Sequence, residues 1–499
     1  GTISCDGPSE TFTITVNPTA QVNDPSDHVV CNGSAIPDIV FTTNNTVGTT
    51  TYGWTNSDPS IGLLSTGSGN ITTFPAINNG TTPVVATITV TPQFEYGTTK
   101  CTGPSQTFTI TVNPTAQVND PSDVVVCHGS STPTIVFTTG NTIGTTSYSW
   151  TNDNPVIGLG GSGNGNIPFF TAVNTGTSPI VGNIAVTPHF TYGSVTCDGP
   201  IQTFTITVNP RAQVNDPADQ VVCNGSPTTE VVFSTGNENI LGTTTYSWAN
   251  SLPGIGLAGS GTGNISSFTA INGGTEPVVA TITVTPHYAY GSVTCDGPPQ
   301  TFTITVNPTA QVNDPADQIV CNGSPVPPII FGTVNTGGVT TYSWVNDNTS
   351  IGLPLGGDGN ISSFAAINTG SAPVVATITV TPHFKNGLVT CGGSSETFTI
   401  TVNPTAQVND PEDQVVCNGT STKEVTFSTN NNTLGTTTYN WTNSAPGIGL
   451  PATGSGKIDA FQAINTGTSP VTATITVTPT FSYDMLSCTG PSQTFTITV

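Results

Sequence analysis

The sequence repeats itself at intervals of slightly under 100 residues. The segment VNDPSDHVVCNGS at residues 22–34 returns with few changes at 118, 214, 312 and 408. The Asn-Pro pair before it begins at residues 17, 113, 209, 307 and 403, so successive copies lie 96, 96, 98 and 96 residues apart. This period is too long for a solenoid repeat and matches one β-sandwich domain of about 100 residues. The sequence therefore predicts five such domains in tandem.

The Asn-Pro pairs also set the predicted domain boundaries. Residues 1–16, GTISCDGPSETFTITV, repeat the end of a unit, so we expect them to be the last part of a preceding domain in a longer protein. Five complete repeats are then expected at 17–112, 113–208, 209–306, 307–402 and 403–499.

Each repeat has the sequence pattern of an antiparallel β-sandwich. In the third repeat, runs rich in Val, Ile and Thr are separated by turns rich in Gly, Pro and Asn, and seven strands are expected. The last run, QTFTITV at 300–306, places Phe302, Ile304 and Val306 on one face and threonines on the other. The predicted fold class is all-β: a tandem array of immunoglobulin-like β-sandwich domains that forms an elongated rod.

All five tryptophans occupy one equivalent place, in the third predicted strand of each repeat: Trp54, Trp150, Trp248, Trp344 and Trp441. A buried tryptophan on this strand anchors the core of immunoglobulin-like sandwiches. We therefore expect these side chains in the core rather than on a sugar-binding surface.

The eleven cysteines follow the repeat, with one near the first strand and one between the last two strands. Their number alone allows pairing within repeats or across repeat boundaries. If the first strand starts at the end of the domain to which the sixth-to-seventh loop returns, the two cysteines of one repeat lie close together. Cysteines across a boundary would then lie about 30 Å apart, too far for a disulfide. Five disulfides are predicted, with Cys5 unpaired: Cys31–Cys101, Cys127–Cys197, Cys223–Cys295, Cys321–Cys391 and Cys417–Cys488.

Several motifs occur in the same order in the repeats: QVVCNGS, TTYSWAN, PVVATITVTP and TCDGP followed by TFTITVNP. This set resembles the PKD-like, immunoglobulin-like tandem repeats of Bacteroidetes (flavobacterial) cell-surface adhesins. These include gliding-motility adhesins exported by the type IX secretion system. The resemblance implies a β-sandwich fold, an extracellular location on the bacterial cell surface, and a stalk or adhesin role without catalytic residues. Repeated disulfides also favour an extracellular environment.

The charge balance restricts the partners of the chain. With 28 Asp and Glu against 5 Lys and Arg, the formal net charge is −23, so the chain cannot neutralise phosphates and nucleic acid is excluded as a partner. No run of about 18 apolar residues occurs, and membrane insertion is not expected. The expected partners are further copies of the same repeat in a longer chain, and other chains in a filament.

Aspartates are concentrated in the VNDPxD segment at the start of each repeat. The ten residues are Asp24, Asp27, Asp120, Asp123, Asp216, Asp219, Asp314, Asp317, Asp410 and Asp413. Carboxylates beside Asn and backbone carbonyls suit Ca²⁺, whereas Asn-Asp-Pro-x-Asp also forms turns by itself. Two interpretations stay open: a calcium-clamped interdomain linker, or carboxylates that bind backbone amides of the turn. In both, Pro25 and its equivalents stiffen the segment, which we expect to be the joint of the rod.

No catalytic site is expected. Gly-rich segments such as GSGTGN at 259–264 lie between strands and suit turns, because no helix follows them to bind a phosphate. His189, His287 and His383 share one position, and the sequence shows no carboxylate or nucleophile beside them that would make a triad. We predict a non-enzymatic stalk or filament segment. Glycan- or peptide-binding modules and a spacer attached to a secreted enzyme are the alternatives.

Overall fold

The computed structural model describes residues 1–431 and 433–499. They form two compact units. The first comprises Gly1–Asn215, Ser234–Tyr246 and Thr285–Pro299, and the second Asp216–Phe233, Ser247–Val284 and Gln300–Val499. The first two repeats belong to the first unit and the last two to the second, and the third repeat contributes to both. The described residues form strands and short 3-10 turns, and none of their helices could span a membrane.

One six-stranded sheet dominates the first repeat. Its strands are β1 (His28–Cys31), β3 (Thr49–Asn56), β4 (Thr66–Ser68), β6 (Val84–Tyr96), β7 (Thr99–Thr102) and β8 (Gln106–Asn113). The order across the sheet is β1-β8-β6-β3-β4, with β7 paired to β6. Strand β1 runs parallel to β8, whereas the other pairs are antiparallel. A 3-10 turn, η1 (Pro59–Ile61), and a small sheet of β2 (Ala35–Ile36) and β5 (Phe74–Pro75) complete the repeat.

The other four repeats have the same sheet order. The second contains β9 (Val124–Cys127), β10 (Thr145–Asn152), η2 (Pro155–Ile157), β11 (Ser162–Asn164), β12 (Ile180–Tyr192), β13 (Val195–Asp198) and β14 (Gln202–Asn209). The third contains β15 (Gln220–Cys223), β16 (Thr243–Asn250), η3 (Pro253–Ile255), β17 (Ser260–Thr262), β18 (Val278–Tyr290), β19 (Val293–Asp296) and β20 (Gln300–Asn307).

The fourth repeat contains β21 (Gln318–Cys321), β22 (Pro325–Val326), β23 (Val339–Asn346), η4 (Thr349–Ile351), β24 (Gly356–Asp358), β25 (Phe364–Ala365), β26 (Val374–Asn386), β27 (Val389–Gly392) and β28 (Glu396–Asn403). The fifth contains β29 (Gln414–Val415), β30 (Thr436–Asn443), η5 (Pro446–Ile448), β31 (Thr453–Ser455), β32 (Thr472–Tyr483), β33 (Leu486–Thr489) and β34 (Gln493–Thr498).

The second layer of each sandwich is built mostly from irregular chain. Where the sequence predicts a second and a fifth strand, the first repeat has the two-residue strands β2 and β5 and a single bridge between Ile39 and Ile71. The backbone N–H of Phe41 donates to the side-chain oxygen of Asn70 at 2.9 Å, so an amide side chain replaces a partner strand. The layer still buries Ile39, Phe41 and Ile61 against the sheet, and the hydrophobic core forms between the two layers.

The five tryptophans lie in these cores, as predicted. Trp54 on β3 is 7% exposed and faces Gly67 of β4 across the antiparallel pair. A Cβ atom on Gly67 would lie 1.9 Å from a carbon of the Trp54 ring, so only glycine fits here. The prediction that the Gly-rich segments serve only as turns is therefore incomplete, because Gly67 makes room for the indole.

The VNDPxD segment packs along its own repeat and is not the joint that the sequence predicts. Just before it, Ala20 is fully buried, and its first residue, Val22, is 6% exposed in the core. The backbone N–H of Asn23 donates to Thr42 O at 2.8 Å. Gly103 approaches Ala20 so closely that a Cβ on the glycine would lie 1.9 Å from the Ala20 carbonyl oxygen. The segment is held between neighbours, and the two repeats meet elsewhere.

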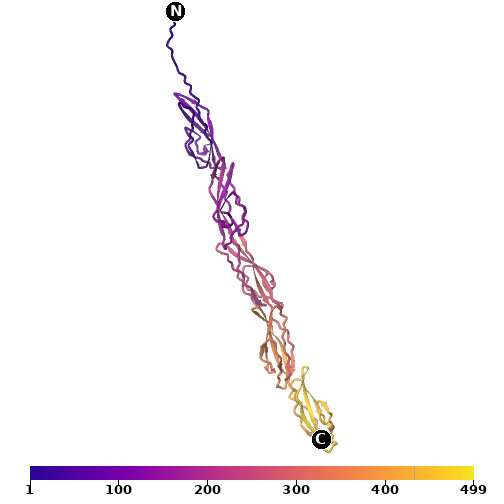
Figure 1. Ribbon diagram of the computed structural model, residues 1–499. Helices are drawn as coiled ribbons and strands as arrows, with labels where there is room; N and C mark the ends of the chain where they lie inside the picture. The colour runs from indigo at the N-terminus through magenta and orange to yellow at the C-terminus, as the bar shows by residue number, and fades with distance from the viewer. Residues whose placement is uncertain (432) are drawn as a thin grey trace. The chain divides into compact units, whose positions relative to one another are not determined.

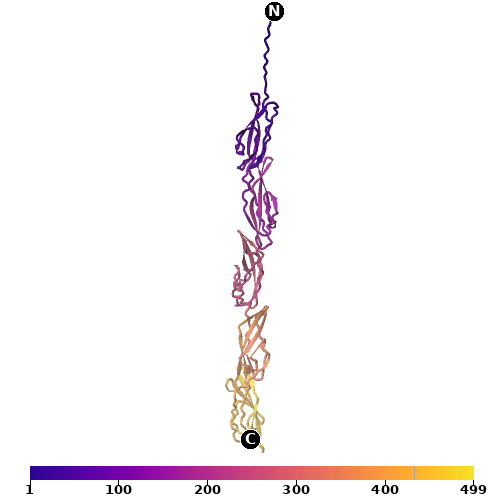
Figure 2. The same ribbon diagram turned by 90° about the vertical axis from the view of Figure 1, so that its left-hand side faces the viewer.

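The N-terminal tail lies outside the first sheet. Figure 1 shows it in indigo as extended chain, and Figure 2 shows the same arrangement from the side. Its apolar side chains are exposed, with Phe12 at 82%, Ile14 at 78% and Val16 at 87%.

Candidate functional site

The two cysteines of one repeat lie at opposite ends of its sheet. Cys31 pairs with Asn113 in the parallel ladder, at the outgoing end where β8 ends and the chain leaves for the next repeat. Strand β6 begins at this end and runs antiparallel to β8. It carries the β6–β7 hairpin, where Cys101 pairs with Phe94, to the incoming end. Ten residues of strand between Val84 and Phe94 correspond to about 33 Å, so Cys31 and Cys101 cannot bond.

Each disulfide instead joins the first-strand cysteine of one repeat to the hairpin cysteine of the next. The bonds are Cys31–Cys197, Cys127–Cys295, Cys223–Cys391 and Cys321–Cys488. Their Cα–Cα distances of 5.5 to 5.6 Å lie in the normal range for a disulfide. Cys5 is free, as predicted, but Cys101 and Cys417 are also free. The predicted pairing within repeats is therefore wrong.

The error comes from the place of the first strand. The prediction assumes that this strand starts at the incoming end of an entirely antiparallel sandwich. In the structure, residues 17–27 run along the repeat without forming a strand, and β1 begins only at His28. Its parallel pairing with β8 then brings Cys31 to the outgoing end. Neither the spacing nor the number of cysteines contains this information.

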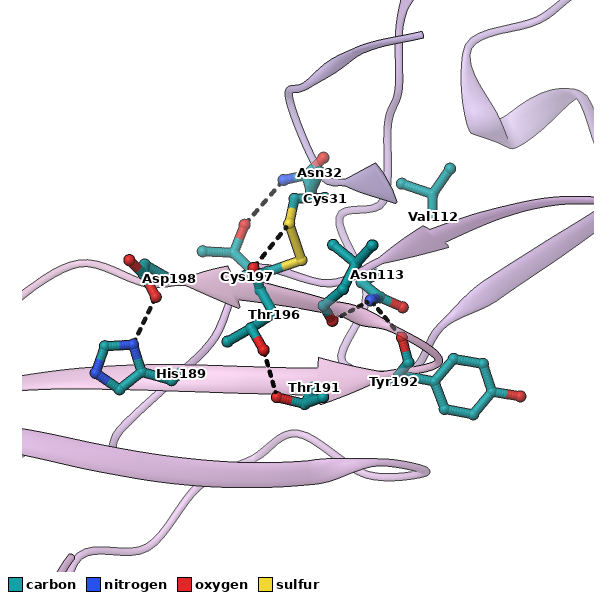
Figure 3. The surroundings of a disulfide bond; sticks show 12 residues. Cys31, Asn32, Val112, Asn113, His189, Thr191, Tyr192, Thr196, Cys197 and Asp198 are labelled. Carbon is teal, nitrogen blue, oxygen red and sulfur yellow. Dashed lines mark hydrogen bonds and ion pairs between the residues drawn. A yellow bond between two sulfur atoms is a disulfide. The ribbon is translucent and has the colours of Figure 1, made fainter. Parts of the chain in front are cut away.

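A buried asparagine supports each disulfide. In the first joint, the side chain of Asn113 is fully buried, and its Nδ2 donates to Tyr192 O at 3.0 Å and Val195 O at 3.3 Å. Both carbonyls belong to the tip of the β12–β13 hairpin, which also carries Cys197 (Figure 3). Asn113 and the disulfide therefore hold the same hairpin of the following repeat.

Further asparagines order the outgoing end on which the hairpin lies. Asn32 donates from Nδ2 to Thr115 Oγ1 at 2.9 Å, and its Oδ1 accepts the backbone N–H of Asn78 at 2.8 Å. Asn78 in turn donates from Nδ2 to Val112 O at 2.7 Å. These bonds fix the residues on both sides of Asn113, so the end of β8 is held before it reaches the next repeat.

A second contact lies between loops of the two repeats. The backbone N–H of Thr142 donates to Thr81 O at 3.0 Å, and Asn141 Nδ2 donates to the same oxygen at 3.4 Å. Asn141 also binds Thr115 O at 3.2 Å. The first joint therefore has three kinds of connection: the covalent chain, the disulfide with Asn113, and the loop contact.

Asparagines equivalent to Asn113 make similar contacts at the other joints. Asn209 donates to Tyr290 O at 3.0 Å, and Asn403 donates to Tyr483 O at 3.3 Å. At the third joint the hairpin residue is Asn386, and its Nδ2 donates to Asn307 Oδ1 at 2.9 Å. The NP motif that the sequence shows as a strand end is thus the hydrogen-bonding centre of the joint.

The ten aspartates that the sequence singles out lie along the repeats and differ in role. In each repeat the second member of the pair binds the last strand of its own sheet, as Asp27 Oδ1 accepts the backbone N–H of Thr109 at 2.6 Å. The equivalent bonds are Asp123 to Thr205, Asp219 to Thr303, Asp317 to Thr399 and Asp413 to Thr496. Among the described residues, the structure forms no group of three or more His, Cys, Asp or Glu that could hold a metal.

These hydrogen bonds favour the charged carboxylate. The pKa of Asp27 lies below its usual value mainly because the backbone N–H of Thr109 donates to it. Hydrogen bonds from Thr205 and Thr303 lower the pKa values of Asp123 and Asp219 in the same way. The second aspartate therefore holds the start of β1 against the last strand of the sheet. Of the two interpretations of the sequence, this is closer to carboxylates that bind backbone amides. The amide, however, belongs to a strand and not to the turn.

The histidines at this position have polar neighbours that the sequence did not show: His287 Nδ1 lies 2.6 Å from Asp296 Oδ1, and His383 Nε2 lies 3.0 Å from Ser343 Oγ. His189 Nδ1 lies 2.5 Å from Asp198 Oδ1, and His189 Nε2 lies 2.8 Å from Ser149 Oγ. The prediction that no carboxylate or nucleophile lies beside it is therefore wrong, because β10 and β13 bring both to the strand that carries His189.

This Ser-His-Asp arrangement lies on the outer face of a sheet. Strand β10 is paired on both sides, with β11 and β12, so the backbone amides near Ser149 are engaged in the sheet ladders. A hydrolase needs free donors aimed at the developing oxyanion. We infer that these three side chains connect neighbouring strands.

No protein-family model matches the sequence, and no curated protein matches it. Solved structures give weak similarity over most of the chain. The Protocadherin GammaB4 extracellular domain is 13% identical, with 96% of this chain and 84% of that chain covered and a TM-score of 0.26. Drosophila N-cadherin EC1-4 is 12% identical, with 76% and 99% covered and a TM-score of 0.25. Sidekick-1 immunoglobulin domains 1-5 are 10% identical, with 96% and 99% covered and a TM-score of 0.21. The strands, their pairing and the buried cores make this chain a tandem array of immunoglobulin-like β-sandwich repeats.

Proposed function

We propose that this chain is a structural segment, a stalk or extracellular filament, of a long bacterial surface adhesin. The observation that carries the proposal is the disulfide at each of the four joints, which ties a repeat to its neighbour in addition to the peptide chain. Two separate attachments restrict bending and twisting more than one linker can. A projecting stalk needs this restriction at every joint.

The chemistry of the joint also supports a place outside the cell. Four disulfides need an oxidising compartment to form and persist. The resemblance of the repeat motifs to Bacteroidetes adhesins supports the narrower proposal of a bacterial cell surface and export by type IX secretion. The net charge of −23 keeps such a long surface polymer soluble.

Small-angle scattering of the oxidised, monomeric chain tests the stalk. Five repeats of about 40 Å each, from strands of about ten residues or more, give an expected maximum dimension of about 200 Å. The matched variant replaces both cysteines of one joint, Cys127→Ala and Cys295→Ala, and should broaden the distribution of dimensions. A compact particle, or a variant with the same distribution as the wild type, would contradict the proposal.

Single-molecule stretching tests the load path directly. In the oxidised chain, a shortest covalent route between the ends follows residues 1–31, 197–223, 391 back to 321, and 488–499, because disulfides bridge the intervening parts. This route has about 140 residues and an extended length of about 480 Å, against about 1,700 Å for the reduced chain. Equal final lengths before and after reduction would show that the joints carry no disulfide.

A further inference from the structure

Asn-Gly pairs are the places where an asparagine side chain most easily loses its amide. The backbone nitrogen of the glycine can attack the side-chain carbonyl carbon of the asparagine, because glycine has no Cβ to hinder the approach. Ammonia then leaves, and the asparagine becomes aspartate or isoaspartate. The sequence contains eight such pairs, which begin at Asn32, Asn79, Asn164, Asn224, Asn272, Asn322, Asn386 and Asn418.

Hydrogen bonds occupy the attacking nitrogen in most of these pairs. In the fourth repeat, the backbone N–H of Gly323 donates to Ala366 O at 2.8 Å. The equivalent N–H groups make bonds of 2.7 to 2.9 Å at Gly33, Gly80, Gly165, Gly225 and Gly419. A nitrogen in such a bond must first release its acceptor before it can attack.

One further pair is protected through the asparagine itself. Asn272 is 5% exposed, and its Nδ2 donates to Glu276 O at 2.9 Å and to Val306 O at 2.7 Å. Its Oδ1 accepts the backbone N–H of Gly274 at 2.9 Å. This amide is held on both sides and cannot turn toward the nitrogen of Gly273.

The pair of Asn386 and Gly387 has neither protection. Strand β26 ends at Asn386, and the turn to β27 begins with Gly387, whose φ is 59°. Gly387 is exposed, and Leu388 after it is 100% exposed. Among the residues that the structure describes, the backbone N–H of Gly387 has no acceptor. The attacking nitrogen is therefore unoccupied and open to water.

The side chain of Asn386 lies in the third joint, beside a buried amide with an unused donor. Its Nδ2 donates to Asn307 Oδ1 at 2.9 Å. Asn307 is fully buried, and its own Nδ2 has no hydrogen-bond partner. A buried N–H without an acceptor is costly, so the hairpin lacks an acceptor that this amide could use.

The other three joints hold the equivalent amide the other way round. Its Nδ2 donates to a backbone carbonyl of the hairpin, as Figure 3 shows for the first joint. The atom without a partner is then Oδ1, at Asn113, Asn209 and Asn403. The fold therefore accommodates an amide whose Nδ2 points at the hairpin, and Asn307 differs only because a side-chain donor faces it.

We propose that Asn386 is a site of spontaneous deamidation and that Asn307 binds the aspartate formed there. The reaction replaces the Nδ2 donor of Asn386 by a carboxylate oxygen, which cannot face Asn307 Oδ1. A half-turn of the Asn307 amide points Nδ2 at the carboxylate, in the orientation that the other joints use. The resulting hydrogen bond is charge-assisted and stronger than one between two neutral amides.

The covalent step needs only water. The nitrogen of Gly387 loses its proton to hydroxide and bonds to Cγ of Asn386, and the Cγ–Nδ2 bond breaks as ammonia leaves. Water then opens the five-membered succinimide ring. Attack at the side-chain carbonyl gives aspartate and an intact main chain, whereas attack at the backbone carbonyl gives isoaspartate. Isoaspartate lengthens the main chain and disturbs the pairing of Asn386 with Val389, so the aspartate is the product that the joint retains.

The rate of the reaction is tested on the oxidised 499-residue chain. The chain is incubated at weakly alkaline pH, and each Asn-Gly pair is followed by peptide mapping with mass spectrometry. We expect Asn386 to deamidate about tenfold faster than Asn322, because Gly323 must first break its hydrogen bond. In the reduced chain in urea the two rates should converge. Equal rates in the folded chain, or the same difference in urea, would overturn the proposal.

Asn386→Asp tests how the joint binds the product. We expect a higher melting temperature than that of the wild type at neutral pH, and a smaller difference at low pH, where the carboxyl is protonated. In an Asn307→Ala background the same substitution should give no increase. An unchanged or lower melting temperature, or an increase that survives Asn307→Ala, would contradict binding by Asn307. The stalk proposal depends on disulfides that all these variants keep, so these outcomes leave it unaffected.

Discussion

Cys31 lies directly beside Asn113 in the parallel ladder between β1 and β8. The two side chains act on one hairpin of the next repeat: Cys31 bonds to Cys197, and Asn113 donates to the carbonyls of Tyr192 and Val195. A covalent and a hydrogen-bonded attachment therefore share one surface at the end of the repeat. Because the ladder sets their spacing, neither attachment can move without the other.

Removing one disulfide should lower the stability of the repeats that it joins. Cys127→Ala with Cys295→Ala opens a link between residues 168 apart in sequence. Closing a loop of this size contributes about 5 kcal/mol in the chain-entropy model, and overlap with the neighbouring loops makes the loss smaller. We expect a melting temperature several degrees lower by calorimetry without reductant. Cys5→Ser, at a free exposed thiol, is the control and should melt like the wild type.

Removing the buried amide should weaken one joint. Asn209→Ala leaves the carbonyls of Tyr290 and Val293 without their donor. A buried polar group that loses its partner costs about 1 to 3 kcal/mol, so denaturant unfolding should shift by that amount. Asn17→Ala changes the same motif where it follows the exposed tail. An equal loss in both variants would show that the asparagine acts outside the joint.

Acid should weaken the attachment of the first strand. The pKa of Asp219 is lowered from 3.8, mainly by the hydrogen bond from the Thr303 backbone N–H. A lowered folded-state pKa adds stability that is present above about pH 4 and is lost as the pH falls through the folded value. Asp219→Asn keeps an acceptor oxygen without the charge. We expect this variant to be less stable than the wild type at pH 7 and to lose less on acidification to pH 2. Parallel pH profiles would contradict the assignment.

Calcium at the VNDPxD segment stays a proposal from the sequence, and chelation tests it. Asp219 Oδ1 already accepts the Thr303 N–H at 2.6 Å, so a bound Ca²⁺ would use the other carboxylate oxygen together with Asp216. If Ca²⁺ binds there, chelator lowers the melting temperature of the wild type and leaves that of an Asp216→Asn, Asp219→Asn variant unchanged. A wild type that melts identically with and without chelator would eliminate calcium binding at this segment.

Filling the space beside the core tryptophan should destabilise the second repeat. In Gly163→Ala the new Cβ would lie 2.2 Å from Trp150 Cζ2, so the ring or the strand must move. Overpacking of this kind costs about 1 to 3 kcal/mol. Gly161→Ala meets its nearest atom, Pro155 Cγ, at 3.6 Å and serves as the control. Equal thermal stability of the two variants would show that the indole does not need the glycine.

The repeat length and the strand alternation predict most of the fold. Phe302, Ile304 and Val306 face the core as the alternation predicts, because a half-buried strand leaves this pattern in the sequence. The sequence predicts more regular strand in the second layer than the structure contains. Residues near Phe233 have the sequence pattern of a strand, but the backbone N–H of Phe233 donates to the side-chain Oδ1 of Asn264 at 3.1 Å. The amide side chain takes the place of a backbone partner, so the strand pairing ends there. The pattern of hydrophobic residues does not reveal such a replacement.

The joint could be predicted only in part. The sequence shows that Cys31 and Asn113 recur in every repeat, but not that they meet, because their contact depends on a parallel strand pair. The triad-like neighbours of His189 were missed for the same reason, since Ser149 is 40 residues and Asp198 nine residues away in sequence. Contacts of this kind depend on strand register, which a repeat period does not determine.

The interleaved disulfides also protect the chain against a single cut. The loops closed by Cys31–Cys197, Cys127–Cys295, Cys223–Cys391 and Cys321–Cys488 overlap in series. Every peptide bond between residues 31 and 488 therefore lies inside at least one loop, and the bonds of 127–197, 223–295 and 321–391 lie inside two. A protease that cleaves one exposed turn leaves both pieces covalently attached through a disulfide, so the covalent connection along the chain is kept. Because each repeat is bonded to the next in this way, a single backbone cleavage between residues 31 and 488 does not separate the chain into two molecules.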